Sequence, residues 1–163
     1  MTPQHIEYTI RLATVHDAAT IARHRAAMFL DMREVSAEQA AILRAESEPW
    51  LAGLLARGDY LGWVCEQGSA IVAGAGILIQ EVGPRPGCYR AGPAAHVVNV
   101  YTEPSHRRRG LARRLMLTIL DWCRDHEMFQ VTLAASDEGR PLYESLGFEA
   151  TNDMRLSPVQ LRL

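Results

Sequence analysis

The stretch Arg107-Arg108-Arg109-Gly110-Leu111-Ala112 joins a predicted strand to a predicted helix. A strand-like apolar pattern over residues 96–102 precedes it, and a helical pattern over residues 111–116 follows it. Backbone N–H groups in the first turn of a helix have no partner within the helix, and the helix dipole adds partial positive charge there. Gly110 lets the backbone approach a phosphate closely, and the flanking arginines supply charge-assisted hydrogen bonds. The sequence therefore predicts a site for a phosphorylated ligand at this turn, although a solvated helix end would have the same composition.

Two motifs follow one another in the second half of the chain. The first is Arg107-x-x-Gly110-x-Ala112, after a predicted strand that ends near Pro104. The second starts with Ala134-Ala135-Ser136 at the end of a short predicted strand and continues as Arg140-Pro141-Leu142-Tyr143-Glu144-Ser145-Leu146-Gly147-Phe148. Together they resemble the pyrophosphate-binding signature and the final helix and turn of the GCN5-related N-acetyltransferase (GNAT) superfamily, whose members bind acetyl-CoA. The resemblance covers nearly the whole chain; it is strong over residues 95–156 and weak before residue 60.

Length and composition fit a single globular domain over residues 1–163. Of the 163 residues 48% are hydrophobic, and no apolar run is long enough to cross a bilayer. The N-terminus lacks the basic and apolar regions of a secretory signal, so we expect a cytoplasmic protein. A net charge of −2 gives no general attraction to nucleic acid or to an anionic membrane, and neither is expected as a partner.

Cysteine and lysine usage narrows the chemistry further. Cys65, Cys88 and Cys123 are widely spaced and include no Cys-x-x-Cys pair, so we expect neither a metal site nor a structural disulfide. The chain has no lysine, which excludes a lysine base or a Schiff base.

Hydrophobic periodicity predicts an α/β (α+β) fold with elements in the order βααβββαβαββ. Strands are predicted over residues 7–12, 60–66, 70–79, 96–103 and 129–133, helices over residues 14–29, 36–55, 110–127 and 138–146, and a final hairpin over residues 149–156. Pro49 allows a break in the second helix, because proline has no N–H and clashes with the preceding turn. The resemblance implies a GNAT-like mixed, mostly antiparallel central sheet of about seven strands flanked by about four helices, with one parallel crossover at the phosphate turn.

The resemblance also assigns the carrier site and a general acid. The turn from Arg107 to Ala112 would hold the pyrophosphate, and the backbone of Val100, Tyr101 and Thr102 would pair with the pantetheine arm and offer an N–H to the thioester oxygen. Ser136 takes the place of an Asn that bonds this arm in many relatives. Tyr143 is the predicted general acid, since a phenol of pKa about 10 can protonate a thiolate whose conjugate acid has a pKa of about 8.5. Its alternative role is simply to pack against its neighbours.

The general base is less well defined. Many relatives carry a Glu on this strand at the position of Val98, which cannot accept a proton. The candidates are His96, Asp31 and Glu34, whereas Asn99 and Glu103 face the other way if the strand is regular. A dedicated base is not required, because deprotonating an amine of pKa about 10 at pH 7 costs about 4 kcal/mol.

The acceptor is expected to be a small amine, with a peptide or protein N-terminus as the next choice. Phe29 offers apolar surface between the first two helices, and Asp31 and Glu34 could attract a cationic amine, although helix packing and solvation would explain them as well. The predicted activity is acetyl transfer from acetyl-CoA to a primary amine by direct attack in a ternary complex. The alternative is a non-catalytic acyl-CoA-binding sensor module. Homodimers are common among relatives, but no feature of this sequence demonstrates one.

Overall fold

The structure, a computed structural model, describes residues 7–156 and contains five strands and four α-helices within them. In chain order these are β1 (Thr9–Leu12), α1 (Ala18–Asp31), α2 (Ala37–Arg57), β2 (Tyr60–Gln67), β3 (Ala70–Val82), β4 (Gly92–Thr102), α3 (Leu111–Asp125), β5 (Val131–Leu133) and α4 (Arg140–Ser145). Two short 3-10 turns, η1 (Val15–Asp17) and η2 (Pro104–His106), precede α1 and the phosphate turn. None of the helices within residues 7–156 has the length and apolar character needed to span a membrane.

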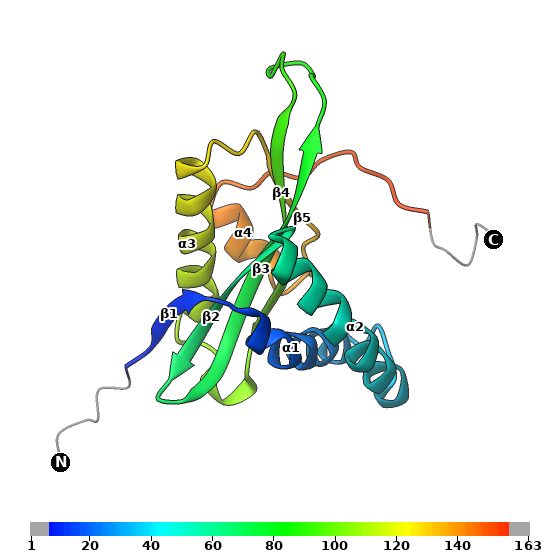
Figure 1. The fold of residues 1–163 in the computed structure, drawn as a ribbon, viewed down its shortest axis with the longest axis vertical. Helices are drawn as coiled ribbons and strands as arrows, with labels where there is room; N and C mark the ends of the chain where they lie inside the picture. The colour runs from blue at the N-terminus through cyan, green and yellow to red at the C-terminus, as the bar shows by residue number, and fades with distance from the viewer. Residues whose placement is uncertain (1–6, 157–163) are drawn as a thin grey trace.

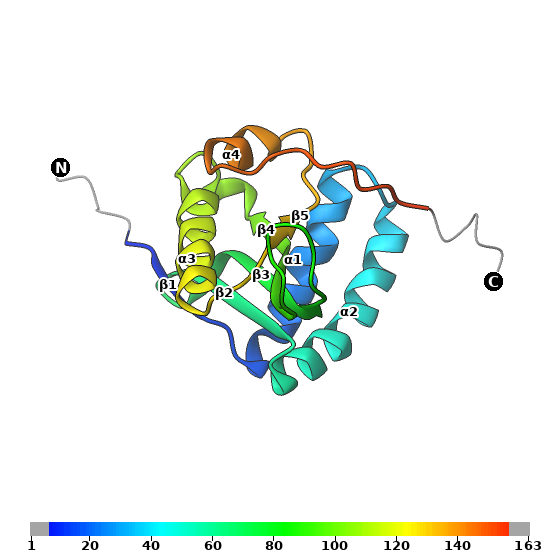
Figure 2. The ribbon, with the colours of Figure 1, turned by 90° about the horizontal axis from the view of Figure 1, so that it is seen from above.

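The strands form one mixed sheet in the order β1-β2-β3-β4-β5. Neighbours are antiparallel except for β4 and β5, which run parallel because α3 connects them as a crossover. Helices α1 and α2 cover one face of the sheet, and α3 and α4 cover the other (Figure 1 and Figure 2). The mixed sheet, its four flanking helices and the parallel crossover are as the sequence predicted.

The core lies on both faces of the sheet, and strand alternation divides it. Val64 of β2 packs toward α1 and α2, while the next residue, Cys65, packs toward α3. The α3 side contains the apolar stripe of that helix, including the fully buried Leu115 and Ile119. Successive side chains of a strand point to opposite faces, so the same strands serve both layers.

Helix α2 is fixed at both ends by its own sequence. The Ser36 hydroxyl accepts the Gln39 N–H (3.2 Å), the Gln39 side chain accepts the Ser36 N–H (2.9 Å), and Gly58 ends the helix with φ 76°. The helix runs unbroken through Pro49, so the break that proline allowed is absent. An interior proline costs about 3 kcal/mol or more. Leu51, two residues later, is completely buried, and this packing holds the helix together across the proline.

The hairpin predicted over residues 149–156 is not formed, so the described sheet has five strands rather than about seven. These residues have no regular structure and are exposed, Met154 by 97%. Alternating apolar side chains form a strand only where a neighbouring strand and a packed layer bury them. The edge strand β5 has only three residues, which gives such a hairpin little to pair with.

Candidate active site at the end of strand β4

The predicted phosphate turn is a strand–turn–helix unit in the structure. β4 ends at Thr102, η2 and a short turn follow, and Gly110 is the N-cap of α3 with φ 75°. No side chain of the described residues caps this helix, and the Arg114 N–H makes its first helical bond, to the Gly110 carbonyl (3.0 Å). The N–H groups of residues 111–113 therefore have no partner within the helix, which is the arrangement that binds phosphates.

The arginines of the turn are in two different environments. Arg107 donates from Nη2 to the Asp31 carboxylate (2.5 Å) and from Nε to the Thr102 carbonyl (2.9 Å). Arg108 and Arg109 are exposed and take part in no ion pair within residues 7–156. An anion at the start of α3 would therefore find the charges of Arg108 and Arg109 uncompensated, whereas the charge of Arg107 is already neutralised by Asp31. The structure thus joins two predicted site residues, Arg107 and Asp31, in a way the sequence did not indicate.

Beyond its middle, β4 has an edge that the other strands of residues 7–156 leave open. It pairs with β5 only through residues 95–97, whereas on its other side β3 remains paired as far as Thr102. Val100, Tyr101 and Thr102, which were predicted to pair with the carrier, lie on this open stretch. Backbone groups that face away from β3 there can hydrogen-bond an extended ligand as if it were another strand.

The expectation that Asn99 and Glu103 face away from Val98 is wrong, because β4 is not regular. Its pairing with β3 shifts between Val98 and Tyr101, so that residues 99 and 100 both stand opposite Ala75. This is a β-bulge, and Asn99 within it has φ 59°. An extra residue in one strand reverses the alternation beyond it. Asn99 and Glu103 therefore lie on the α1 side of the sheet, the side to which Val98 also packs.

Asn99 links α1 to Tyr60, the first residue of β2. Its amide oxygen accepts a hydrogen bond from Arg25 Nη1 (2.8 Å), and its amide nitrogen lies 3.4 Å from the hydroxyl of Tyr60. Tyr60 is buried, and that burial raises the pKa of its phenol to about 12. The phenol is therefore neutral and available as the acceptor for Asn99.

Glu103 forms a second polar cluster with α1. Its Oε1 accepts from Arg23 Nη1 (2.6 Å) and lies 3.1 Å from Nε2 of the buried His24. Burial lowers the pKa of His24, and the charge of Arg23 lowers it further, against the opposing effect of Glu103. The His24 ring also lies 5.0 Å from the Tyr101 ring, centroid to centroid. Through His24, the cluster therefore packs against Tyr101, a residue on the open edge of β4.

Ser136 and Tyr143 meet around Gly139, at the start of α4. The Ser136 hydroxyl accepts the Gly139 N–H (3.1 Å), and a Cβ on Gly139 would lie 2.9 Å from Cε2 of Tyr143. Tyr143 packs against the α3-side core and makes an edge contact with Phe148, with ring centroids 6.0 Å apart. Burial raises the pKa of Tyr143, so its phenol stays protonated at neutral pH.

The remaining predicted residues are dispersed. His96 lies on the part of β4 that pairs with β5, and its Nδ1 is 2.8 Å from the Thr132 hydroxyl. Phe29 lies under the guanidinium of Arg25, 5.0 Å from ring centroid to Cζ. Glu34 is exposed just after α1. The structure therefore does not gather the three candidate bases: Asp31 is ion-paired, Glu34 is solvated, and His96 is bonded within the sheet.

Sequence reasoning did not identify Arg25, Tyr60 or His24 as neighbours of the site. Arg25 and Phe29 are four residues apart, a spacing that signals contact on a helix. Nothing in the apolar pattern of β4 indicates a bulge that turns Asn99 toward them. The tolerance of asparagine for positive φ was the one available signal.

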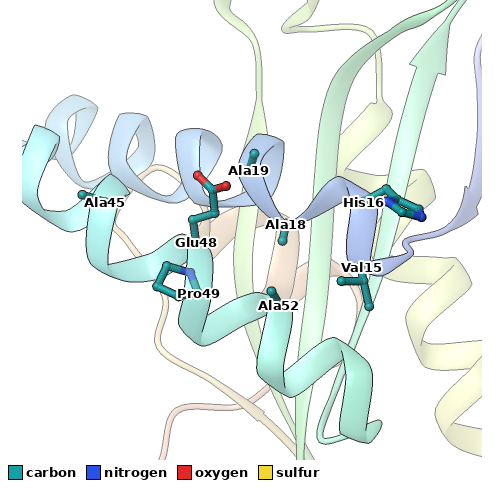
Figure 3. Close-up of a pocket in the computed structure, with 8 residues that line it drawn as sticks. All are labelled: Val15, His16, Ala18, Ala19, Ala45, Glu48, Pro49 and Ala52. Carbon is teal, nitrogen blue, oxygen red and sulfur yellow. The ribbon is translucent and has the colours of Figure 1, made fainter.

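A hollow of about 410 Å³ lies elsewhere, between the beginning of α1 and the middle of α2 (Figure 3). Figure 3 shows it lined by small side chains together with His16 and Glu48. A helix rises 1.5 Å per residue, so Asp31 at the other end of α1 is about 20 Å away. This hollow is not part of the arrangement around β4. Within residues 7–156 no group of three or more His, Cys, Asp or Glu side chains is placed to hold a metal ion.

Comparison with known proteins gives a family match over most of the chain. Residues 21–148 match the model of the acetyltransferase (GNAT) family. A GCN5-related N-acetyltransferase from Ralstonia eutropha JMP134 has the same fold, with a TM-score of 0.86, 31% identity, and coverage of 94% of this chain and 99% of that one. A predicted acetyltransferase from Clostridium acetobutylicum, solved with acetyl-CoA, has a TM-score of 0.84 at 22% identity over 94% and 98% of the two chains.

One curated relative is also similar in sequence. The glucosamine 6-phosphate N-acetyltransferase of Trypanosoma brucei brucei is 36% identical over 87 residues. The match covers 53% of this chain and 56% of the trypanosomal protein, so it spans about half of each.

Proposed function

The chain belongs to the acetyltransferase (GNAT) family, and on this premise we propose that it transfers an acetyl group from acetyl-CoA to a primary amine. The observation that carries the proposal is the adjacency of an open strand edge and an uncapped helix start. Both are produced by one chain segment, from the bulge in β4 to the first turn of α3. Acetyl-CoA has an extended, amide-containing pantetheine arm and a pyrophosphate. It therefore needs a strand edge for the arm and, beside it, a helix start for the pyrophosphate.

In this proposal the protein holds the carrier mainly through its backbone. The N–H groups of residues 111–113 bind the pyrophosphate, and Arg108 and Arg109 supply charge. Val100 and Thr102 pair with the pantetheine arm along the open edge of β4. The Ser136 hydroxyl accepts a bond from Gly139 and keeps its own proton to donate to that arm.

The chemistry is a direct transfer. Bound acetyl-CoA supplies a thioester carbon, at which a C–N bond forms while the C–S bond breaks and its electron pair goes to sulfur. A backbone N–H on the open edge of β4 donates to the thioester oxygen as that oxygen gains negative charge. Tyr143 donates its phenolic proton to the departing sulfur, and its raised pKa ensures that it enters the reaction protonated.

The amine must lose a proton, and His96 carries the imidazole that we propose to accept it. Val98 occupies the strand position at which many relatives have a carboxylate. The Nδ1 atom of His96 is engaged with Thr132, so Nε2 is the atom that accepts the proton if His96 is the base. Transfer to bulk water is the second route, at a cost of about 4 kcal/mol for an amine of pKa about 10 at pH 7.

The proposed acceptor is a small primary amine. Phe29, Asp31 and Glu34 at the end of α1 are the residues proposed to contact it. The trypanosomal relative is named for glucosamine 6-phosphate, which is therefore the first amine to try. The absence of a carboxylate at Val98 supports a second candidate function, a sensor that binds acyl-CoA without turnover.

The test is calorimetric titration with acetyl-CoA, followed by free-thiol release in the presence of a panel of amines. Micromolar binding with thiol release that depends on one class of amine is the expected result. Binding without release from any amine would favour the sensor. Absence of binding would contradict the carrier site built on β4 and α3.

A further inference from the structure

Arg25 is an arginine of α1 held between two aromatic side chains. Its Cζ lies 5.0 Å from the centroid of the Phe29 ring and 5.4 Å from that of Trp50 on α2. Trp50 is 42% exposed, so this aromatic pair lies partly at the surface. Aromatic faces attract the guanidinium and orient its plane, so Arg25 is fixed rather than free to sample solvent.

Within residues 7–156 this arginine has no carboxylate partner. Its hydrogen bond to a described residue is the one to the amide oxygen of Asn99, a neutral group (2.8 Å). Burial lowers the pKa of Arg25; the nearby Tyr60 phenol opposes this shift, and no carboxylate does. Other arginines of the same region are neutralised, Arg23 by Glu103 and Arg107 by Asp31. A half-buried cation without a counter-ion is costly, and proteins keep such a group where a ligand supplies the missing charge.

Most of the guanidinium remains available. An arginine carries five N–H donors, and Arg25 uses one nitrogen, Nη1, for Asn99. Within residues 7–156 no fully buried side-chain nitrogen or oxygen lacks a hydrogen-bond partner. The Nε and Nη2 atoms of Arg25 bond no described residue and are not fully buried, so within residues 7–156 they are open to a ligand. Their planar fork matches the two oxygens of a carboxylate or a phosphate.

Arg25 also adjoins the place of the proposed reaction. Asn99, to which it is bonded, is the bulge residue on the open stretch of β4, directly before Val100. Phe29, on the same face of α1, is one of the residues proposed to contact the acceptor. An anionic group bound at Arg25 would tether a small molecule on the α1 side of that stretch, leaving its amine within reach of the edge.

We propose that Arg25 is the anion-binding residue of the acceptor site, so that the acceptor is a small primary amine carrying a carboxylate or a phosphate. This assignment rests on the proposed acetyl-transfer function. Arg25 acts on specificity: it binds the non-reacting end of the acceptor and takes no part in the proton transfers. Asn99 orients the guanidinium and takes up one of its donors.

The experiment measures thiol release with pairs of amines that differ in the anionic group. One pair is glucosamine 6-phosphate and glucosamine, and the other is β-alanine and its carboxamide, so the two arms separate phosphate from carboxylate. The variants are Arg25→Gln and Arg25→Lys. Arg44→Gln is the matched control, because it removes an exposed positive charge from the neighbouring helix α2. Circular dichroism melts check that each variant is folded.

For at least one pair the unaltered protein should prefer the anionic member by tenfold or more in kcat/KM. Arg25→Gln should lose about ten- to hundredfold in kcat/KM for that member, mostly through KM, and little for its neutral partner. Arg25→Lys keeps the charge but not the fork and should fall between the two. Arg44→Gln should change neither member.

Two results would overturn the assignment alone: equal turnover of both members of each pair, or a loss in Arg25→Gln that affects both members equally through kcat. The second result would mean that Arg25 merely supports the bulge. Absence of thiol release with every amine, despite binding of acetyl-CoA, would instead overturn the proposed transferase function and this assignment with it.

Discussion

Asn99 has a left-handed backbone conformation in the middle of β4, with φ 59°. Asparagine tolerates this conformation better than most residues, and its amide serves as both acceptor and donor once the bulge has turned it toward α1. It accepts from Arg25 and approaches Tyr60 as a donor. Asn99 therefore reverses the side-chain alternation of β4 beyond it and also makes the polar contacts that hold the bulge in place.

Tyr143 is the residue on which the proposed proton transfer to sulfur depends. Tyr143→Phe should lower kcat about 10²-fold or more, because removing a general acid typically costs that much, while the Kd for acetyl-CoA stays within about twofold. The ring contact with Phe148 survives this substitution, so stability should change little. Steady-state thiol release and calorimetric titration measure the two quantities.

The matched control for this change is Tyr89→Phe. Tyr89 loses the same hydroxyl but is 85% exposed in the connection between β3 and β4. Equal rates for Tyr143→Phe and the unaltered protein would reduce Tyr143 to a packing residue.

His24 should make stability depend on pH near neutrality. Burial lowers its pKa below the ordinary 6.5, so in the window below pH 6.5 the unfolded chain binds a proton that the folded chain does not. The free energy of unfolding should therefore fall as the pH drops from 7 to 5.5, by at most about 1.4 kcal/mol per pH unit from this group. Urea denaturation at a series of pH values measures the slope.

His24→Gln should flatten that slope, since glutamine can still donate to Glu103 but does not titrate. His16→Gln, which removes an exposed histidine from η1, should leave the slope as it was. A slope unchanged by His24→Gln would assign the pH dependence to other groups.

At the scale of elements, the sequence predicted those whose signals are local. The helical spacing that begins near Ser36 and the apolar stripe of α3 place both helices within a few residues of their observed bounds. The errors arose where tertiary contacts decide. The buried Leu51 keeps α2 intact through Pro49, and residues 149–156 lack a layer to pack on. The bulge at Asn99 depends on contacts with Arg25 of α1 and Tyr60 of β2. The phosphate turn was predictable because it is one continuous segment, whereas the Arg25–Asn99–Tyr60 contact joins three distant segments.

The pairing of β2 with β3 requires a glycine at position 76. Gly76 stands opposite Gly62, and a Cβ on Gly76 would overlap the ring and hydroxyl of the buried Tyr60. Gly76→Ala should destabilise the protein by about 1–3 kcal/mol, the usual cost of overpacking a core. It should also disturb Asn99, since Tyr60 has to move. Gly83→Ala is the control, because a Cβ there meets nothing within 4 Å. Thermal melts of the two variants that coincide would contradict the close packing of Tyr60 on β3.

At the scale of the whole molecule, the open stretch of β4 lies between two layers with different proposed roles. α1 and α2 cover the face proposed for the acceptor, and α3 and α4 cover the other face and provide the phosphate turn and Tyr143 (Figure 2). The ion pair between Asp31 and Arg107 connects them, from the last residue of α1 to the phosphate turn. We therefore expect binding at one layer to affect binding at the other through this ion pair.

Asp31→Asn tests that connection. The substitution removes the carboxylate that occupies Arg107, so the guanidinium becomes available to the pyrophosphate and local negative charge falls. Because an exposed ion pair contributes about 0.2–1 kcal/mol, acetyl-CoA should bind up to about fivefold more tightly. The gain should shrink in high salt, which screens exposed charges.

Asp121→Asn is the control, because it also removes an exposed carboxylate paired with an arginine, Arg124, but on the outer surface of α3. Calorimetric Kd values at low and high salt decide the matter: weaker binding in Asp31→Asn than in Asp121→Asn would mean that the ion pair positions Arg107 for the carrier instead of competing with it.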